Sequence, residues 1–340
     1  MKAIVYTRYG SPDALQLQEV EKPEPSDYQV LIKVQAASVN AYDCRLMRGK
    51  PFLVRIISGG LLKPKDQQLG IDLAGRVEAV GRKATQFQVG DEVFGRGLGA
   101  FADYACAREE ALVLKPANLS FEAAAAVPGA ALIALLSLRD SGQLRPGQTV
   151  LIDGATGGVG TFAVQLAKAF GAEVTGVCST RNLDLVRSIG ADHVIDYTQA
   201  DCTKHGQRYD LILAVNGYHS IFAYKRALRP TGRYVMVGAS KAHLMRAVLQ
   251  ALLLGPVLSR TGRQKMGLFL AKPTQKKNLA IIKDLLEAGK VVPVIDRSYP
   301  LREVPDAIRY VEEGHIRGKV VITVEQNNHT SESPNQNELY

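Results

Sequence analysis

The hydrophobic positions in the first third of the chain follow the two-residue alternation of half-buried strands. Val30–Val39 is β-branched and partly alternating, and Gly70–Val80 and Gly90–Phe94 repeat short apolar runs behind glycines. Short strands at this spacing, separated by turn residues, are typical of a small β barrel rather than of a parallel sheet. We therefore predict a barrel-like β unit over residues 1–120.

The hydrophobic period changes near Leu119. Ser120, followed by Glu122 and a run of alanines, predicts the N-cap of a helix. From Thr149 onward, apolar strands alternate with helices that end at glycines, which predicts βαβ units and a doubly wound parallel sheet within residues 121–270. The predicted strands are Thr149–Ile152, Glu173–Cys178, His193–Ile195, Tyr209–Val215 and Gly232–Val237, and the predicted helices are Gly160–Phe170 and Leu183–Ile189.

Beyond this alternation, an apolar stretch, Leu244–Leu258, is flanked by basic residues from Lys241 to Lys265. It fits a basic amphipathic helix on a membrane surface, or, as we favour, a packed helix that covers a cleft or a subunit contact. The polar residues 326–340 are predicted to be disordered. Between the basic apolar stretch and this polar tail, we predict helices at Leu279–Ala288 and Val304–Glu313, and strands at Val291–Ile295 and Gly318–Val324.

The composition adds a basic charge to this picture. The 340 residues carry a net charge of +9, which suits nucleic acid, an anionic membrane or, as we favour, an anionic cofactor. No block of five like charges and no nucleic-acid module is present, so we expect no nucleic-acid partner. The four cysteines are scattered without a CxxC pair, and the N-terminus lacks a signal-peptide core, so we expect a reducing, cytoplasmic location.

A glycine-rich turn between a predicted strand and a predicted helix indicates a dinucleotide site. In the segment from Leu151 to Gly160, Ala155, Gly157 and Gly160 occupy the three special positions of the fingerprint. Gly157 would let the backbone approach a pyrophosphate, and Gly160 would permit close helix–strand packing. Amides of the first helical turn, around Thr156, Gly158 and Val159, would hold the anion. The alternative is a purely structural turn, which the flanking strands and helix make less plausible.

The residues after the second strand of this unit point to NADPH. An enzyme that uses NAD usually has Asp or Glu there to bind the ribose hydroxyls. This chain has Ser179, Thr180 and Arg181 after Cys178, and no acid. The two hydroxyls donate hydrogen bonds, and Arg181 suits a 2′-phosphate. The alternative is that Arg181 is a solvated loop cation.

Several longer motifs extend over most of the chain. They are Ala37–Asp43, Gly70–Gly75, Phe87–Phe94, Gly99–Tyr104, Ala124–Gly129, Gly190–Asp192 and Gly314–Lys319. Together with the glycine-rich turn, these motifs resemble the medium-chain dehydrogenase/reductase superfamily, and in particular its zinc-free quinone oxidoreductase branch. The resemblance implies a Rossmann NADP-binding domain at 121–270, inserted in a GroES-like β-barrel catalytic domain formed by residues 1–120 and 271–325. It also implies a homo-oligomer, most simply a dimer.

The resemblance also bears on zinc. Zinc-dependent relatives have Cys and His where this chain has Asn40 and Ile71. Isoleucine cannot bind a metal and asparagine is a poor zinc ligand, so we expect no metal site.

Without zinc, other groups must stabilise the negative charge that develops on the substrate oxygen. The resemblance places Asn40 and Tyr42 beside the nicotinamide, where an amide and a phenol could donate hydrogen bonds, with Asp43 fixing their orientation. The alternatives are a turn residue, a packing residue and a helix cap. We expect residues 45–65 to select the substrate.

Further cofactor contacts are expected along the carboxyl edge of the sheet, where ligands bind in open α/β folds. Tyr197 could pack on the adenine, and Asn216 ends the next strand. Gly238 and Ala239 follow the strand after that and would approach the nicotinamide, while Lys319 would reach a phosphate.

These features together predict an NADPH-dependent oxidoreductase that reduces a quinone or an α,β-unsaturated carbonyl without zinc. Two alternatives stay open. One is a metal-free, NADP-dependent alcohol or ketone dehydrogenase, and the other is a non-catalytic NADPH-binding protein associated with RNA or with a membrane.

Overall fold

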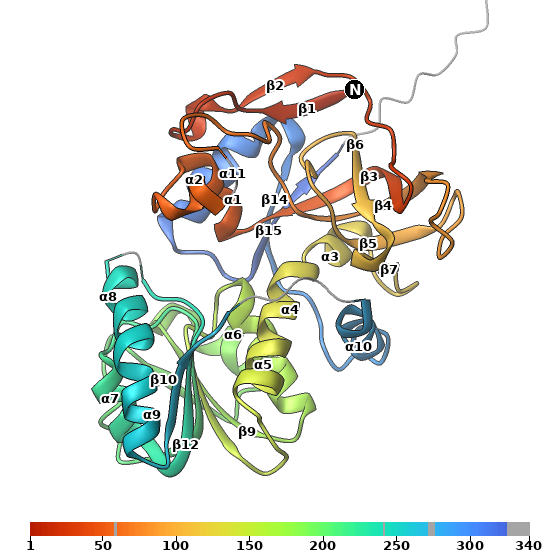
Figure 1. Cartoon of the computed structure of the whole chain (residues 1–340). Helices are drawn as coiled ribbons and strands as arrows, with labels where there is room; N and C mark the ends of the chain where they lie inside the picture. Colours follow the sequence, from red (N-terminus) through yellow and green to blue (C-terminus); the bar gives the residue numbers. More distant parts are fainter. Residues whose placement is uncertain (58–59, 241, 271–275, 325–340) are drawn as a thin grey trace, which may run out of the picture.

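Six parallel strands form the sheet in the lower half of the molecule in Figure 1. The computed structural model describes residues 1–57, 60–240, 242–270 and 276–324, so the predicted tail at 326–340 lies outside the described residues. The strand order is β10-β9-β8-β11-β12-β13, the arrangement of a Rossmann fold. The strands are β8 (Thr149–Asp153), β9 (Glu173–Cys178), β10 (His193–Asp196), β11 (Tyr209–Ala214), β12 (Leu228–Met236) and β13 (Lys265–Leu268).

Helices cover both faces of this sheet, which explains why its central strands are apolar at nearly every position. All five residues of β8 are buried. The helices α4 (Pro128–Leu136) and α5 (Gly158–Ala169) contribute Leu135 and Phe162 to one core cluster with β8. On the other face, α7 (Ile221–Ala227) packs Tyr224 against Leu151 and Met236 in a second cluster. The helix α6 (Leu183–Ser188) precedes β10.

The upper half of Figure 1 is built on a mixed, mostly antiparallel sheet. Its strand β15 pairs antiparallel with β3, with Val320 opposite Val39, so the two ends of the chain meet in one sheet. The strand order is β14-β15-β3-β4-β5-β7, with β6 also paired to β3. Their bounds are β3 (Gln29–Val39), β4 (Asp72–Val80), β5 (Glu92–Arg96), β6 (Tyr104–Arg108), β7 (Leu112–Leu114), β14 (Ile295–Pro300) and β15 (Lys319–Thr323), beside the hairpin of β1 (Lys2–Val5) and β2 (Gln16–Glu19).

The two sheets confirm the predicted fold class of a Rossmann domain and a GroES-like β domain. Ser120 caps α3 (Phe121–Ala125), as predicted, because its hydroxyl accepts a hydrogen bond from the Ala123 amide at 3.1 Å. The remaining α-helices are α1 (Ala41–Arg48), α2 (Leu53–Ile57), α8 (Leu244–Leu249), α9 (Gly255–Thr261), α10 (Lys276–Glu287) and α11 (Val304–Glu313). Single turns of 3₁₀ helix lie at Pro12–Ala14, Glu109–Ala111, Thr180–Asn182 and Leu301–Glu303, and π-helical turns at Ser137–Ser141 and Gln250–Leu254.

One predicted strand is misplaced, and one observed strand was not predicted. The predicted strand at Val291–Ile295 lies one strand length too early, because β14 begins only at Ile295 and continues through the polar residues to Pro300. The short edge strand β13 was missed, since Lys265–Leu268 follows a basic, apolar helical stretch without a turn signal of its own. Across the described ranges, no helix has the length and apolarity needed to cross a membrane.

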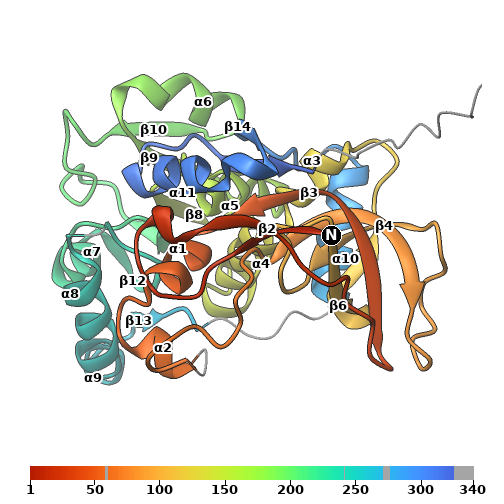
Figure 2. The same cartoon turned by 90° about the horizontal axis from the view of Figure 1, so that it is seen from above.

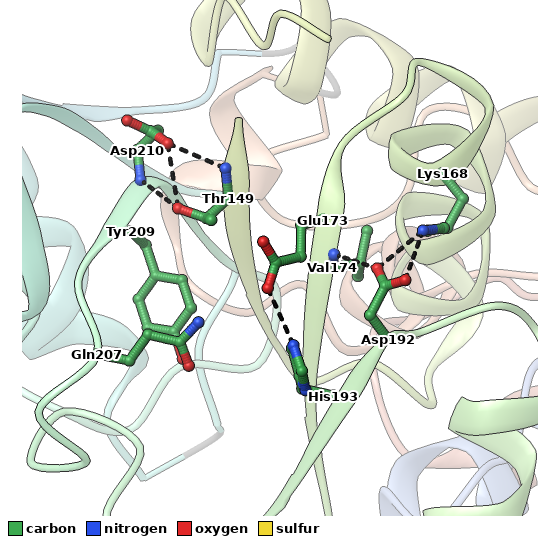
Figure 3. Close-up of polar contacts among 9 residues, drawn as sticks. All are labelled: Thr149, Lys168, Glu173, Val174, Asp192, His193, Gln207, Tyr209 and Asp210. Atoms are coloured by element: carbon green, nitrogen blue, oxygen red, sulfur yellow. Dashed lines mark hydrogen bonds and ion pairs between the residues drawn. The ribbon is translucent and has the colours of Figure 1, made fainter. Parts of the chain in front are cut away.

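Polar contacts join the strands of the Rossmann sheet at their amino ends (Figure 3). The Asp210 carboxylate accepts hydrogen bonds from the amide and hydroxyl of Thr149, at 2.9 and 3.1 Å. On the neighbouring strands, His193 contacts Glu173 at 2.9 Å, and Asp192 accepts a hydrogen bond from the Val174 amide at 2.7 Å. The cavities described below lie at the opposite edge, at the carboxyl ends of β8 and β9.

Candidate active site between the two sheets

Two glycines after β8, one in the turn and one in the first turn of α5, could not be replaced by another residue without a backbone shift. Gly154 has a φ of +94°, and a Cβ there would lie 2.8 Å from the Asn216 backbone nitrogen. A Cβ on Gly160 would lie 2.0 Å from the Gly154 carbonyl oxygen, which is well inside van der Waals contact. Ala155 is fully buried between these two glycines. The turn therefore packs tightly against the sheet on one side.

Its other side is open. Gly157 is the N-cap of α5, and a Cβ on it would meet no atom within 4 Å. A Cβ on Gly158 would lie 2.8 Å from the Cδ atom of Lys319. The first amides of a helix have no partner within the helix, so α5 presents unpaired donors beside this open face. The arrangement fits the pyrophosphate of a dinucleotide, whose approach needs a bare backbone.

Two cavities extend from this turn and share part of their walls. The first, the Asn40 cavity, has a volume of about 490 Å³ and is lined by Asn40, Gly157, Gly158 and Lys319 among others. The second, the Arg181 cavity, has a volume of about 270 Å³ and lies over the ends of β8 and β9. The residues lining both are Gly154, Thr156, Asn216, Ser240, Gly314 and Ile316. Together they form a continuous cleft from one sheet to the other.

The Arg181 cavity has a cation and hydroxyls at its outer end. Ser179, Arg181 and Tyr197 line it, and the Arg181 guanidinium donates a hydrogen bond to the His315 carbonyl at 3.3 Å. Thr180 is not among the residues that line this cavity, and its hydroxyl donates to the Asp196 carboxylate at 2.5 Å. Asp196 is therefore occupied by a neighbour and is not among the residues that line this cavity.

Asn40 lies at the start of α1 and is held at every polar atom of its side chain. Its Oδ1 accepts a hydrogen bond from the Lys319 ammonium at 2.6 Å. Its amide nitrogen donates to the Asp72 carboxylate at 3.0 Å and to the Ser38 carbonyl at 3.3 Å. Both amide hydrogens are thus used within the protein. The prediction that Asn40 donates to a substrate is therefore not supported by this geometry, although Asn40 does line the cavity.

Lys319 and Asp72 extend this contact into a buried charged network that joins the two domains. Lys319, at the start of β15, also donates to the Val39 carbonyl at 3.0 Å. Asp72, at the start of β4, accepts a hydrogen bond from the Gly129 amide at 2.9 Å and lies 3.5 Å from the Arg96 guanidinium. Burial lowers the pKa of Lys319, against the opposing effect of Asp72. The network fixes the wall of the cleft where β3, β4, β15 and α4 converge.

Tyr42 faces a third cavity rather than the Asn40 cavity. This Tyr42 cavity has a volume of about 380 Å³, and Arg96, Lys65 and Ile71 also line it. Tyr42 is 42% exposed, and its hydroxyl makes no hydrogen bond to any residue that the structure describes. Burial raises the pKa of Tyr42, so the phenol stays protonated at neutral pH. Asp72 connects the two sites, since it binds Asn40 on one side and Arg96 on the other.

Asp43 has a structural position. Its carboxylate accepts a hydrogen bond from the Asn40 amide at 2.7 Å, and the side chain is fully buried. Burial raises the pKa of Asp43 to about 7. It therefore caps α1 and fixes the backbone of Asn40, and no hydrogen bond joins it to Tyr42.

The predicted cofactor residues divide into those that line the cleft and those that shape it. Thr156, Gly157, Gly158, Val159, Ser179, Arg181, Tyr197, Asn216 and Lys319 line it. Ala155, Gly160, Thr180, Gly238 and Ala239 are not among its lining residues. After β12 the backbone at Gly238 packs against the Val215 carbonyl, and Ser240 reaches the cleft instead.

Sequence reasoning missed four further residues at the site. Asp72 and Arg96 complete the charged network, and Tyr218 and Ser240 line the Arg181 cavity. Asp72 could have been noticed because it lies within the Gly70–Gly75 motif. Arg96, Tyr218 and Ser240 belong to no motif that the sequence analysis identified.

A possible metal-binding group lies elsewhere. In the part of the chain that the structure describes, Asp201, Cys202 and His219 form the only group of three such side chains whose ligand atoms lie within 4.8 Å of one another. None of the three lines the cleft. Asn40, which lines the cleft, already uses its side-chain polar atoms in hydrogen bonds within the protein. Ile71, which lines the Tyr42 cavity, has no atom that could bind a metal.

Comparisons with known proteins agree with the fold. The description "Alcohol dehydrogenase GroES-like domain" matches residues 26–117, and "Zinc-binding dehydrogenase" matches residues 189–322. The chain is 35% identical to the 2-methylene-furan-3-one reductase of Solanum lycopersicum, over 95% of this chain and 79% of that protein. It is 32% identical to the chloroplastic NADPH-dependent alkenal/one oxidoreductase of Arabidopsis thaliana, with the same coverage. The solved quinone oxidoreductase of Coxiella burnetii superposes with a TM-score of 0.83, at 30% identity over 96% of this chain and 99% of that one.

Proposed function

Since the chain belongs to the medium-chain dehydrogenase/reductase superfamily, in its quinone oxidoreductase-like branch, we propose that it transfers a hydride from NADPH to a quinone or an α,β-unsaturated carbonyl without zinc. The observation that carries the proposal is the continuous cleft between an open glycine turn and the Asn40–Lys319–Asp72 network. An oxidoreductase of the quinone or enone reductase kind is what the relatives already indicate.

The preference for NADPH rests on the outer end of the cleft. The amides at the start of α5 would hold the pyrophosphate, and Ser179 and Arg181 would hold the 2′-phosphate. Asp196, the nearest carboxylate on the neighbouring strand, is engaged by Thr180. An NADH enzyme would need a free carboxylate at this point to bind the ribose hydroxyls. The bound nicotinamide supplies the hydride, and the protein positions it.

The Tyr42 cavity would bind the substrate oxygen. For an enone, a hydride forms a bond to the β-carbon, the carbon–carbon π bond breaks, and its electrons move to the oxygen. Tyr42 and Arg96 face that cavity with a phenol and a guanidinium, which are hydrogen-bond donors suited to the developing charge. A proton then completes the product at the α-carbon. For a quinone, hydride addition to a ring carbon likewise places negative charge on one oxygen, which takes up one proton. The added ring hydrogen then leaves the carbon as a proton while the second carbonyl oxygen gains one, so one hydride and one proton in total give the hydroquinone.

The absence of zinc from this chemistry is supported by the residues themselves. A zinc site needs at least three ligand side chains with an open position for substrate. The Asn40 side chain is already bound by Lys319 and Asp72, and Ile71 has no donor atom. A conjugated acceptor spreads the charge that a metal would otherwise stabilise, so hydrogen-bond donors suffice.

The test compares cofactors and acceptors in one set of assays. Purified protein treated with a chelator should oxidise NADPH with a quinone and an enone, and should prefer NADPH to NADH. Arg181→Asp should lower the NADPH preference by about tenfold to a hundredfold, because one charged contact is lost and a repulsive carboxylate is gained. Arg187→Asp is the matched control, since Arg187 is an exposed cation on α6 outside the cleft.

Three outcomes would oppose the proposal. An unchanged cofactor preference in Arg181→Asp removes the argument for NADPH. Reduction of NADP⁺ by simple alcohols, without quinone or enone turnover, assigns the chain to the alcohol dehydrogenases. Loss of turnover on chelation, restored by zinc, would contradict the metal-free mechanism. The Cys202→Ser variant would then show whether that zinc binds at the Asp201–Cys202–His219 group outside the cleft.

A further inference from the structure

The charge of the chain is concentrated in one long segment. Residues 211–283 contain 13 Lys and Arg and not one Asp or Glu, whereas the rest of the chain contains 29 basic and 33 acidic residues. Eight of these 13 cations lie on described residues from α7 through β13, and α7, α8 and α9 lie at one outer edge of the Rossmann domain in both views (Figures 1 and 2). Three others, Lys276, Lys277 and Lys283, belong to α10 on the other side of the molecule. This edge of the molecule is therefore strongly basic, although the chain as a whole is only moderately so.

The same edge exposes an apolar stripe. The helices α8 and α9, with the π-helical turn between them, pack Ala251 and Leu254 inward against the Rossmann core. The opposite face of these helices is apolar as well and is not needed for that packing. Its side chains, which we call the α8–α9 stripe, are between 49% and 66% exposed. They are Met245, Leu249, Leu252, Leu253 and Val257.

Cations surround the stripe. Arg246, Arg260, Arg263 and Lys265 are all exposed. The first three form no ion pair with any residue in the described ranges, and Lys265 donates only to the Ser259 carbonyl, at 3.0 Å. No carboxylate in this segment neutralises them.

A second patch of the same character lies on the same side of the molecule. Around α2, Phe52, Ile56 and Leu61 are exposed, and Leu62 is 90% exposed. In Figures 1 and 2, α2 lies on the same side as α8 and α9. Exposed lysines border this patch too, and one of them, Lys65, lines the Tyr42 cavity.

We propose that the α8–α9 stripe and its cations dock this protein on the surface of an anionic lipid bilayer. Apolar side chains on one helix face would enter the interface between headgroups and acyl chains, and the arginines would contact anionic headgroups. The apolar stripe thus matches the acyl-chain region of such a membrane, and the surrounding cations match its anionic headgroups. The α2 patch would bring the mouth of the Tyr42 cavity toward the same bilayer.

Two other occupants fit less well. A second copy related by a twofold axis would place this basic edge against itself, with no carboxylate in residues 211–283 to pair the charges. Nucleic acid would match the charge, but the stripe offers it aliphatic side chains and no aromatic ring for base stacking. An anionic bilayer uses both properties of the surface.

The experiment is cosedimentation of the full-length protein with vesicles. We expect binding to phosphatidylcholine vesicles that contain phosphatidylserine, weak binding to phosphatidylcholine alone, and release at high salt. Arg246→Gln, Arg260→Gln and Arg263→Gln combined should weaken binding by about a hundredfold, since each cation near an anionic surface contributes about fivefold. Leu249→Gln with Leu253→Gln should weaken binding by at least about tenfold.

Matched controls keep charge and exposure comparable. Arg82→Gln removes an exposed cation in the turn after β4, and Leu17→Gln removes an exposed leucine on β2. Both should bind vesicles as the wild type does. All variants should keep the wild-type circular dichroism and thermal unfolding, because the changed side chains point to solvent.

Several results would overturn the proposal. They are equal sedimentation with and without phosphatidylserine, unchanged binding in the stripe and arginine variants, or equal weakening in the controls. Light scattering that shows a dimer split by Leu249→Gln with Leu253→Gln, without vesicle binding, would assign the stripe to a second copy. Salt-sensitive binding to an RNA oligonucleotide that is lost in the arginine variants but kept in the leucine variants would assign the edge to nucleic acid.

Discussion

Two glycines three residues apart, the N-cap of α5 and the third residue of that helix, should respond in opposite ways to the same added methyl group. At Gly157 a Cβ meets no atom within 4 Å, and the φ of −77° suits any residue. At Gly160 a Cβ would lie 2.0 Å from the Gly154 carbonyl oxygen and 2.8 Å from the Ala155 carbonyl carbon. Gly157→Ala should therefore affect the ligand, and Gly160→Ala should affect the fold.

The magnitudes follow from these distances. Gly157→Ala replaces a glycine N-cap by a poorer one, which costs about 1 kcal/mol of stability at most. Its methyl group occupies the open face, so a pyrophosphate loses at least one charged hydrogen bond, worth about 1.5–3 kcal/mol or roughly tenfold to a hundredfold in affinity. Gly160→Ala gains about 1 kcal/mol of helix propensity, but the overlap forces a backbone shift that costs about 3 kcal/mol or more.

The assay pairs NADPH titration by isothermal calorimetry with urea unfolding of both variants and the wild type. We expect Gly157→Ala to lose at most about 1 kcal/mol of stability but to bind NADPH weakly, and Gly160→Ala to lose about 2 kcal/mol of stability or more. Wild-type NADPH affinity in Gly157→Ala would refute the assignment of the open turn to the pyrophosphate. Wild-type stability in Gly160→Ala would refute the packing argument.

Three further predictions test single side chains. Tyr42→Phe should lower kcat by about tenfold to a hundredfold without changing the affinity for NADPH, because only the hydroxyl at the substrate cavity is lost; unchanged kcat in steady-state assays would remove Tyr42 from the chemistry. Lys319→Met should cost about 3–5 kcal/mol in urea unfolding, because it leaves Asp72 buried with less compensating charge; a loss below about 1 kcal/mol would contradict the network. Burial raises the pKa of Asp153 to about 7. Between about pH 4 and pH 7 this carboxyl is therefore protonated in the native state but ionised in the unfolded state. The free energy of unfolding should fall as the pH rises through that window, by up to about 4 kcal/mol from this group. Asp153→Asn should make this slope shallower when unfolding is compared at pH 5 and pH 8, leaving the contribution of Asp43, whose pKa is also raised to about 7. Slopes parallel to that of the wild type would contradict the burial argument.

Much of the Rossmann domain could be predicted because its signals are local. The strand at Glu173–Cys178 and the helix at Val304–Glu313 were predicted at their observed bounds, since glycines or prolines flank strongly patterned residues. The strand β14 was placed wrongly because its residues, Ile295–Pro300, are half exposed and polar, so they carry little hydrophobic pattern. The edge strand β13 is four residues long and follows an apolar helical stretch, which no local rule separates from it.

The site was predictable only where one segment supplies it. The glycine turn and Arg181 are adjacent to a recognisable strand, and the structure brings both to the same cleft. The charged network is different, because Asn40 and Lys319 are 279 residues apart and meet only through the antiparallel pairing of β3 and β15. Arg96 joins it through Asp72 on a third strand. Sequence spacing contains no information about that register, and so the saturation of Asn40 could not be anticipated.

The most direct test of the central claim follows one deuterium atom. Chelator-treated enzyme is given an enone and NADPH that carries deuterium at the nicotinamide carbon from which the hydride leaves, and the product is analysed by mass spectrometry and NMR. We expect deuterium at the β-carbon of the reduced product, formed at the rate seen before chelation. Product without deuterium, or turnover that returns only when zinc is added, would contradict it.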